Sequence, residues 1–126
     1  MSLLVDTHIL LWWLADDPNL PLSAADAIAE GETEVFVSAA SVWEIAIKKA
    51  AGRLDAPDDL LEVLEANDFE ELSMTSAHAM AAGELPPHHA DPFDRMLIAQ
   101  SHAENLTVVT VDTRFIAYDV ELLPLQ

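Results

Sequence analysis

The sequence contains no cysteine, few basic residues and no long uninterrupted apolar run. The absence of cysteine excludes disulfide bonds and thiolate metal sites, and it favours a reducing compartment. No apolar run approaches the roughly 20 residues that a membrane span requires. The apolar N-terminus lacks a basic segment and is interrupted by Asp6 and His8, which argues against a secretory signal peptide. We therefore expect a soluble protein of the cytoplasm that makes no membrane contact.

Positive charge is scarce, because 5 Lys and Arg residues stand against 23 Asp and Glu residues, for a net charge of −18. Such a chain should repel nucleic acid on average, since Lys and Arg supply most non-specific affinity for phosphate. The composition also suggests adaptation to high salt. The basic residues lie close in sequence to three acids: Lys48, Lys49 and Arg53 follow Glu44, Arg95 adjoins Asp94, and Arg114 lies just past Asp112. Local ion pairing explains this pattern, and so does a crevice that must hold both a metal ion and phosphate.

The chain has 126 residues, of which 52% are hydrophobic, and this predicts one folded domain over residues 1–126 with its own core. Apolar patterns predict strands over residues 3–6, 34–37, 69–73, 107–111 and 120–123, and helices in the intervening segments. Strands that alternate with helices indicate a parallel sheet with right-handed crossovers. The expected fold class is therefore α/β, with three layers and a central parallel sheet of four to five strands.

Asp6 lies where the first expected strand gives way to a helix. The preceding residues, Leu3 to Val5, are all apolar and predict a strand that is buried on both faces. Ile9 and Leu10 begin a helical pattern directly afterwards. Asp6 therefore occupies the carboxyl end of a strand, where open parallel sheets form their ligand crevices. Simple capping of the following helix explains the same residue equally well.

Three later acids could converge on the same edge. Glu44 lies in a helix that is apolar on most of its circumference, where an unpaired carboxylate is costly, although pairing with Lys48 is an alternative. Asp94 follows Asp91 by three residues, so the two could form a capping box instead of a site. Asp112 directly follows the expected strand 107–111 and could cap the next turn. If the strands before Asp6 and Asp112 are neighbours, however, their carboxylates are neighbours too.

Carboxylates that converge without a cation repel one another strongly. Oxygen donors, with no cysteine and no histidine pair at helical spacing, select a hard cation such as Mg²⁺ or Mn²⁺. His88 and His89 form a poor metal clip because adjacent side chains diverge, and we interpret them as a solvated loop tip. His8 fits either a first-turn helix residue or a contributor to the site.

Four segments together resemble the successive motifs of the PIN-domain family. They are Leu4–His8, Ser41–Ile45, Asp91–Gln100 and Val109–Asp112. The whole chain resembles the small toxin branch of that family, the VapC-type ribonucleases of type II toxin–antitoxin systems. The match covers nearly all of the chain with the motifs in order, and the segment around Asp94 is its most specific part.

The resemblance implies a metal-dependent endoribonuclease of PIN-like fold. Its catalytic, metal-binding acids would be Asp6, Glu44, Asp94 and Asp112, with Thr7, Thr110 and Arg95 as supporting residues. Asp91 is interpreted as a helix cap. One or two Mg²⁺ ions, or Mn²⁺, would activate a water for attack on an RNA phosphodiester. The resemblance also implies a homodimer and an antitoxin whose basic tail lies in the acidic crevice.

Tryptophans supply a further expectation about partners. Trp12 and Trp13 are adjacent on the first expected helix and point about 100° apart, so we expect one of these two to face a groove or a second subunit. The alternative is that all three tryptophans, Trp43 included, lie in the core or are partly covered. Two other functional classes stay open at this point. A phospho-receiver domain would require a lysine late in the chain, yet none follows Lys49. A non-catalytic binding module on the same scaffold would need no chemistry from the acids.

Overall fold

A parallel sheet organises the computed structural model, which describes residues 1–125. The strands are β1 (Ser2–Val5), β2 (Glu34–Ser38), β3 (Glu70–Leu72) and β4 (Thr107–Val109). Their order is β3-β2-β1-β4 and every pairing is parallel. β1 lies between β2 and β4, so the residue after β1 is adjacent to both neighbouring strand ends.

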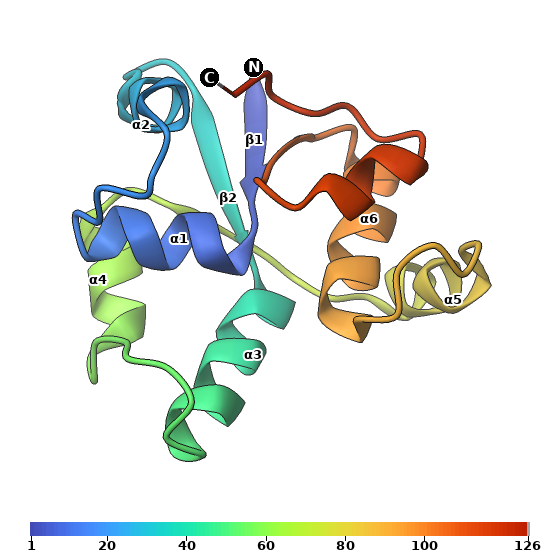
Figure 1. The fold of residues 1–126 in the computed structure, drawn as a ribbon, viewed down its shortest axis with the longest axis horizontal. Coiled ribbons are helices and arrows are strands. Elements are labelled where there is room, and N and C mark those ends of the chain that lie inside the picture. Colours follow the sequence, from blue (N-terminus) through green and yellow to red (C-terminus); the bar gives the residue numbers. More distant parts are fainter. Residues whose placement is uncertain (126) are drawn as a thin grey trace.

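Helices cover both faces of the sheet (Figure 1). They are α1 (Thr7–Leu14), α2 (Leu22–Ala29), α3 (Ala39–Ala50), α4 (Leu60–Ala66), α5 (Ser76–Glu84) and α6 (Pro92–Glu104), followed by a 3₁₀ turn, η1 (Thr113–Ala117). In the view of Figure 1, α1, α2 and α4 lie on one side of β1, and α5 and α6 lie on the other. No helix within residues 1–125 is long and apolar enough to cross a membrane.

Side chains of β1 alternate between two hydrophobic cores. Leu3 and Val5 pack with residues of α1 to α4, including Ile9 and Ile45. Leu4 points to the opposite face and packs with α6 and η1, including Phe115. Because successive strand side chains point to opposite faces, a strand that is apolar at every position must be covered on both sides. The predicted three-layer α/β fold with a four- to five-stranded parallel sheet is confirmed.

The carboxyl end of β4 differs from the expectation. β4 ends at Val109, two residues earlier than predicted, and Val5 pairs with Val109. Asp6 is therefore level with Thr110, and Asp112 lies beyond the sheet. The backbone leaves the sheet here because the Thr110 hydroxyl accepts a hydrogen bond from the Asp112 N–H, at 3.0 Å.

The expected last strand is reduced to a bridge. Residues 120–123 contain no full strand, but Leu122 forms an isolated parallel bridge with Val108. The Val108 N–H donates to the carbonyl of Glu121 at 2.8 Å, and the Leu123 N–H donates to the carbonyl of Val108 at 2.9 Å. This short contact covers the outer edge of β4, so the sheet has four strands and the start of a fifth.

Candidate active site

Asp6 combines the two roles that the sequence left open. It is the N-cap of α1, where its Oδ1 accepts the Ile9 N–H at 2.9 Å. Its Oδ2 accepts a hydrogen bond from the Thr110 hydroxyl. The carboxylate is buried, and burial is the main cause that raises its pKa above the usual value of 3.8, with a smaller contribution from the charge of Asp112. Capping holds this side chain at the sheet edge, so the same carboxylate both caps α1 and belongs to the candidate site.

Glu44 is a buried carboxylate on the inward side of α3. The Thr7 hydroxyl donates to its Oε1 at 2.6 Å. Lys48, one helical turn later, donates to its Oε2 at 2.5 Å. Ion pairing with Lys48 is thus present, and it leaves Glu44 oriented by partners from two different helices. Thr7 follows Asp6 directly, so α1 and α3 bring these two acids to the same edge.

Asp91 performs the capping at the start of α6. Its Oδ1 accepts the N–H groups of Phe93 and Asp94, at 2.8 and 3.4 Å. The interpretation of Asp91 as a cap is supported by this geometry. Asp94, three residues later, uses its side chain elsewhere, so the pair does not form a capping box.

Asp94 lies among other acids. Its pKa is raised to about 6, first by burial and then by the charge of Asp91, with further contributions from Asp6 and Glu44. His89 acts in the opposite direction and lowers it. The mutual influence of Asp6, Glu44 and Asp94 shows that three elements distant in sequence, the ends of β1, α3 and α6, bring their carboxylates together.

Asp112 occupies the outer side of the cluster. Arg114 donates to both of its carboxylate oxygens, from Nε to Oδ1 at 3.0 Å and from Nη2 to Oδ2 at 2.8 Å. These hydrogen bonds hold the pKa of Asp112 down at about 2. β1 and β4 are adjacent, as the expectation for these two acids required, but Thr110 and not Asp112 is level with Asp6, so Asp112 acts on Asp6 from beyond the sheet.

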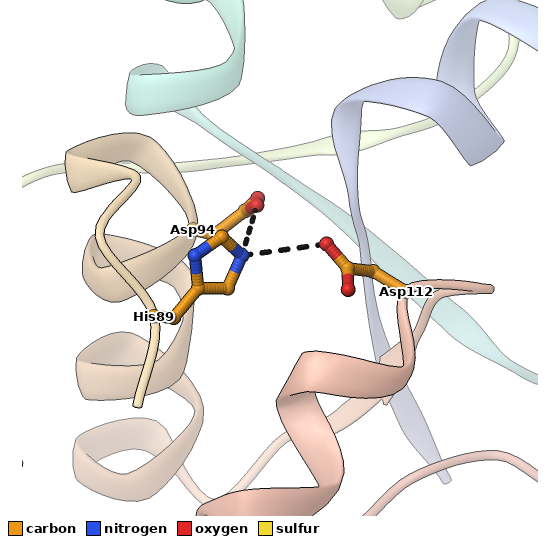
Figure 2. A group of neighbouring side chains, drawn as sticks. All are labelled: His89, Asp94 and Asp112. Carbon is orange, nitrogen blue, oxygen red and sulfur yellow. Dashed lines mark hydrogen bonds and ion pairs between the residues drawn. The ribbon is translucent and has the colours of Figure 1, made fainter. Parts of the chain in front are cut away.

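His89 was interpreted from the sequence as part of a solvated loop tip, and this is wrong. Its imidazole is buried, with Nε2 2.8 Å from Asp94 Oδ2 and 3.3 Å from Asp112 Oδ2 (Figure 2). His88 is exposed and packs edge-on against Tyr118, with ring centroids 5.2 Å apart. The two side chains do diverge: His88 points to solvent and His89 points into the site. The only available signal was the proximity of His89 to Asp91 and Asp94 in the sequence.

Arg95 points away from the acids and binds the loop before α6. Its guanidinium donates to a set of backbone carbonyl oxygens, those of Ala82, Leu85, Pro86 and His89. Arg95 therefore acts on the site through the loop that carries His89, and not through a contact with Asp94.

The tryptophans divide between core and surface. Trp12 and Trp13 are half-buried and pack against the core, and Trp13 Nε1 donates to Asn67 Oδ1 at 3.0 Å. Trp43 is 57% exposed and packs edge-on against Phe93, with ring centroids 5.4 Å apart. The most exposed tryptophan is thus the one that directly precedes Glu44. His8 is exposed in the first turn of α1.

The donor set fits a divalent cation. Asp6, Glu44 and Asp94 offer oxygen ligands only, and carboxylates that are buried together need a counter-charge. Within residues 1–125, Ser41 Oγ is the one buried side-chain polar atom without a hydrogen-bond partner. Ser41 lies one helical turn before Glu44, on the same side of α3. An orphaned oxygen beside a carboxylate cluster is what a hydrated ion would satisfy.

Comparisons with known proteins agree with the fold. The family model described as PIN domain matches residues 3–121. Ribonuclease VapC22 of Mycobacterium tuberculosis is 29% identical over 116 residues, which cover 90% of this chain and 88% of that protein. Among solved structures, VapBC2 from Rickettsia felis bound to a promoter DNA fragment has a TM-score of 0.73 at 15% identity, and a toxin–antitoxin complex from Klebsiella pneumoniae has 0.70 at 16%. In both, the match covers 98% of each chain. The chain belongs to the PIN domain family.

Proposed function

We propose that this protein is a Mg²⁺- or Mn²⁺-dependent endoribonuclease and the toxin of a type II toxin–antitoxin pair in the cytoplasm. The observation that carries the proposal is the cluster of Asp6, Glu44 and Asp94, two buried carboxylates and one partly buried carboxylate from separate elements that meet where β1 ends. The similarity to a VapC ribonuclease supports RNA as the substrate.

The chain's own residues would hold and orient the metal. Asp6, Glu44 and Asp94 would supply the inner ligands, and Asp112 would contribute from the outer side. Thr110 and the Ile9 N–H each engage one oxygen of Asp6, and Thr7 and Lys48 each engage one oxygen of Glu44, so the orientation of both carboxylates is fixed. A divalent cation bound there lowers the pKa of water and stabilises charge on the phosphodiester oxygens.

The partners of the basic side chains have a consequence for RNA binding. Lys48 is paired with Glu44, Lys49 with Asp58, and Arg114 with Asp112. Arg95 is occupied by the loop carbonyls. Four of the five basic side chains are thus engaged in the protein, and Arg53 is exposed without an ion pair among residues 1–125, so we expect contacts to phosphate to depend largely on the divalent ion. We therefore expect RNA binding to be much weaker in chelator than in Mg²⁺.

An antitoxin is the proposed protein partner, together with a second copy of the chain in a homodimer. The structural neighbours solved as VapBC and toxin–antitoxin complexes support the antitoxin. A basic segment would complement the acid cluster, and an apolar anchor is expected near Trp12 or Trp13. A cleft of about 480 Å³ lies nearby, lined by apolar side chains such as Leu61, Leu64 and Phe69 and also by four acidic residues, so it suits a segment that is both apolar and basic. A complex whose interface avoids both the acids and these aromatic residues would contradict this mode.

The decisive experiment uses purified protein free of antitoxin. Total RNA is incubated with it in chelator, in Mg²⁺ and in Mn²⁺, and RNA binding is measured in the same buffers by mobility shift. We expect cleavage only with a divalent ion. Binding without cleavage in either ion would favour a non-catalytic binding module. Cleavage that persists in chelator would contradict the metal-dependent assignment.

A further inference from the structure

The loop before α6 is held rigidly by two side chains that take no part in the acid cluster. The Arg95 guanidinium donates to the carbonyls of Ala82 and Leu85, at 2.8 Å each. The Tyr118 hydroxyl accepts the N–H groups of His88 and His89, at 3.1 and 3.0 Å. Tyr118 in turn donates to the carbonyl of Pro86 at 2.6 Å. These bonds fix the backbone of His89 from both sides.

The imidazole of His89 is fixed as well. It packs edge-on against Phe115, with centroids 6.0 Å apart and an interplanar angle of 86°. Its Nδ1 accepts the backbone N–H of Asp91 at 3.2 Å. A neutral imidazole carries one hydrogen, on either nitrogen. Because Nδ1 is an acceptor here, that hydrogen lies on Nε2.

The Nε2–H group faces two carboxylates at once. It donates a hydrogen bond to Asp112 Oδ2 at 3.3 Å, and Asp94 Oδ2 lies at ion-pair distance from the same nitrogen, at 2.8 Å, between α6 and the segment that follows β4 (Figure 2). We propose that His89 is a positioning residue whose Nε2–H holds Asp94 and Asp112 together, through a hydrogen bond to Asp112 and a close contact with Asp94, and that it is not a metal ligand. The inference rests on the proposed metal centre, and it adds an imidazole to the carboxylates and threonine hydroxyls already described there.

The alternative is that His89, Asp94 and Asp112 bind a transition metal directly. Their ligand atoms lie within 4.8 Å of one another, which is a suitable spacing for such a site. Nε2 could ligate a metal only if the imidazole hydrogen moved to Nδ1. That hydrogen would then oppose the N–H of Asp91, whose own side chain caps α6. The geometry therefore favours a hydrogen-bond donor between the two acids, where their like charges would otherwise separate them.

Two substitutions separate hydrogen-bond donation by His89 Nε2 from the packing of the His89 side chain. In His89→Asn, the amide oxygen can replace Nδ1 as the acceptor for Asp91, but no group reaches the position of Nε2. In His89→Gln, the amide nitrogen can reach that position and donate. Binding of Mg²⁺ and Co²⁺ alone is measured by calorimetry for the full-length wild type and both variants. Thermal unfolding in chelator monitors their folding.

We expect His89→Asn to bind both ions about 10- to 100-fold more weakly, the usual cost of losing a residue that orients metal ligands. The affinity of His89→Gln for both ions should stay close to that of the wild type. A purely structural role would lower the unfolding temperature of both variants without separating them in metal affinity. The imidazole ¹⁵N chemical shifts of the metal-free wild type supply an independent readout, and we expect the hydrogen on Nε2.

Four results would overturn the inference. Equal metal affinity of the wild type and His89→Asn would remove the positioning role while leaving the metal centre intact. A selective loss of Co²⁺ over Mg²⁺ in both variants, or a hydrogen on Nδ1, would show that His89 is a ligand. A wild type that binds neither ion would overturn the proposed metal centre and the role of His89 with it.

Discussion

The inner and outer sides of the acid cluster compensate their charge in different ways. On the inner side, Asp6 and Asp94 are withdrawn from solvent, and burial raises the pKa of both. On the outer side, Asp112 is held by Arg114, which lowers the pKa of Asp112 to about 2. The two sides meet at His89, which contacts Asp94 and Asp112 together.

This difference indicates where a cation is needed. A carboxylate with a bidentate arginine already has its counter-charge and gains less from a metal. A buried carboxylate whose hydrogen-bond donors are hydroxyl and backbone groups, as in Asp6, has none. We therefore expect the inner acids to govern metal binding and the outer acid to adjust it, and the following experiments test this division.

The largest effect is expected on the inner side. Asp6→Asn, Glu44→Gln and Asp94→Asn should each lower RNA cleavage by more than about 100-fold, because each removes a charged metal ligand without changing core volume. Cleavage rates in Mg²⁺ and toxicity on expression are the measurements. Circular dichroism should show that the variants fold. Cleavage by Asp94→Asn at the wild-type rate would mean that the inner side is wrongly identified.

A smaller effect is expected on the outer side. Asp112→Asn should lower cleavage by about 10-fold, at the weak end of the range for residues that support a metal site. Its carboxylate is already neutralised by Arg114. The same assay compares it with Asp94→Asn, and equal losses in the two variants would show that inner and outer acids are equivalent.

Part of this division was accessible from the sequence. The all-apolar run Leu3 to Val5 required a strand covered on both faces, and the change to helical spacing placed Asp6 at its end. Glu44 and Asp94 could be selected because a carboxylate in an apolar helix, or one beyond an existing cap, needs an explanation. Local patterns determine such features, so they can be read without knowing the tertiary structure.

Features that depend on tertiary contacts could not be predicted in this way. His89 enters the site because Arg95 and Tyr118 hold its loop, and the contact with Tyr118 joins residues 29 positions apart in sequence. The early end of β4 follows from Thr110, whose hydroxyl binds Asp6 across the sheet. Propensity favoured a longer strand through Val111, and the side-chain contact with Asp6 prevailed.

A third effect concerns the stability of the metal-free protein. Acids with raised folded pKa values bind protons more tightly than they do in the unfolded chain, so the free energy of unfolding should fall as pH rises from roughly 4 through about 6, the folded pKa of Asp94. Asp94→Asn should remove part of this loss and stabilise the metal-free protein at neutral pH by on the order of 1 kcal/mol. Mg²⁺ at a hundredfold excess over its dissociation constant should restore about 2.7 kcal/mol in the wild type.

The control for this experiment is Glu65→Gln, an exposed substitution on α4 that removes the same charge from a chain of net charge −18. Loss of any carboxylate relieves some general repulsion. Thermal unfolding in chelator and in Mg²⁺, from pH 4 to pH 8, would compare the two. If both variants gain the same stability in chelator, and Mg²⁺ stabilises both as much as it stabilises the wild type, the inner acids form no metal site.

The smallest effect should come from the arginine of the outer side. Arg114→Gln removes the partner of Asp112, but the Arg114 side chain is 62% exposed, so we expect only a small loss of stability at neutral pH. A lowered folded pKa contributes stability above the unfolded value near 4, and this contribution is lost as pH falls through about 2. The difference between the wild type and Arg114→Gln should therefore be present at pH 7 and disappear near pH 2. Arg53→Gln is the matched control, since Arg53 is exposed and forms no ion pair among residues 1–125. If both variants lose the same stability at pH 7 and keep that loss on acidification, net charge alone accounts for it, and Arg114 does not neutralise the outer acid.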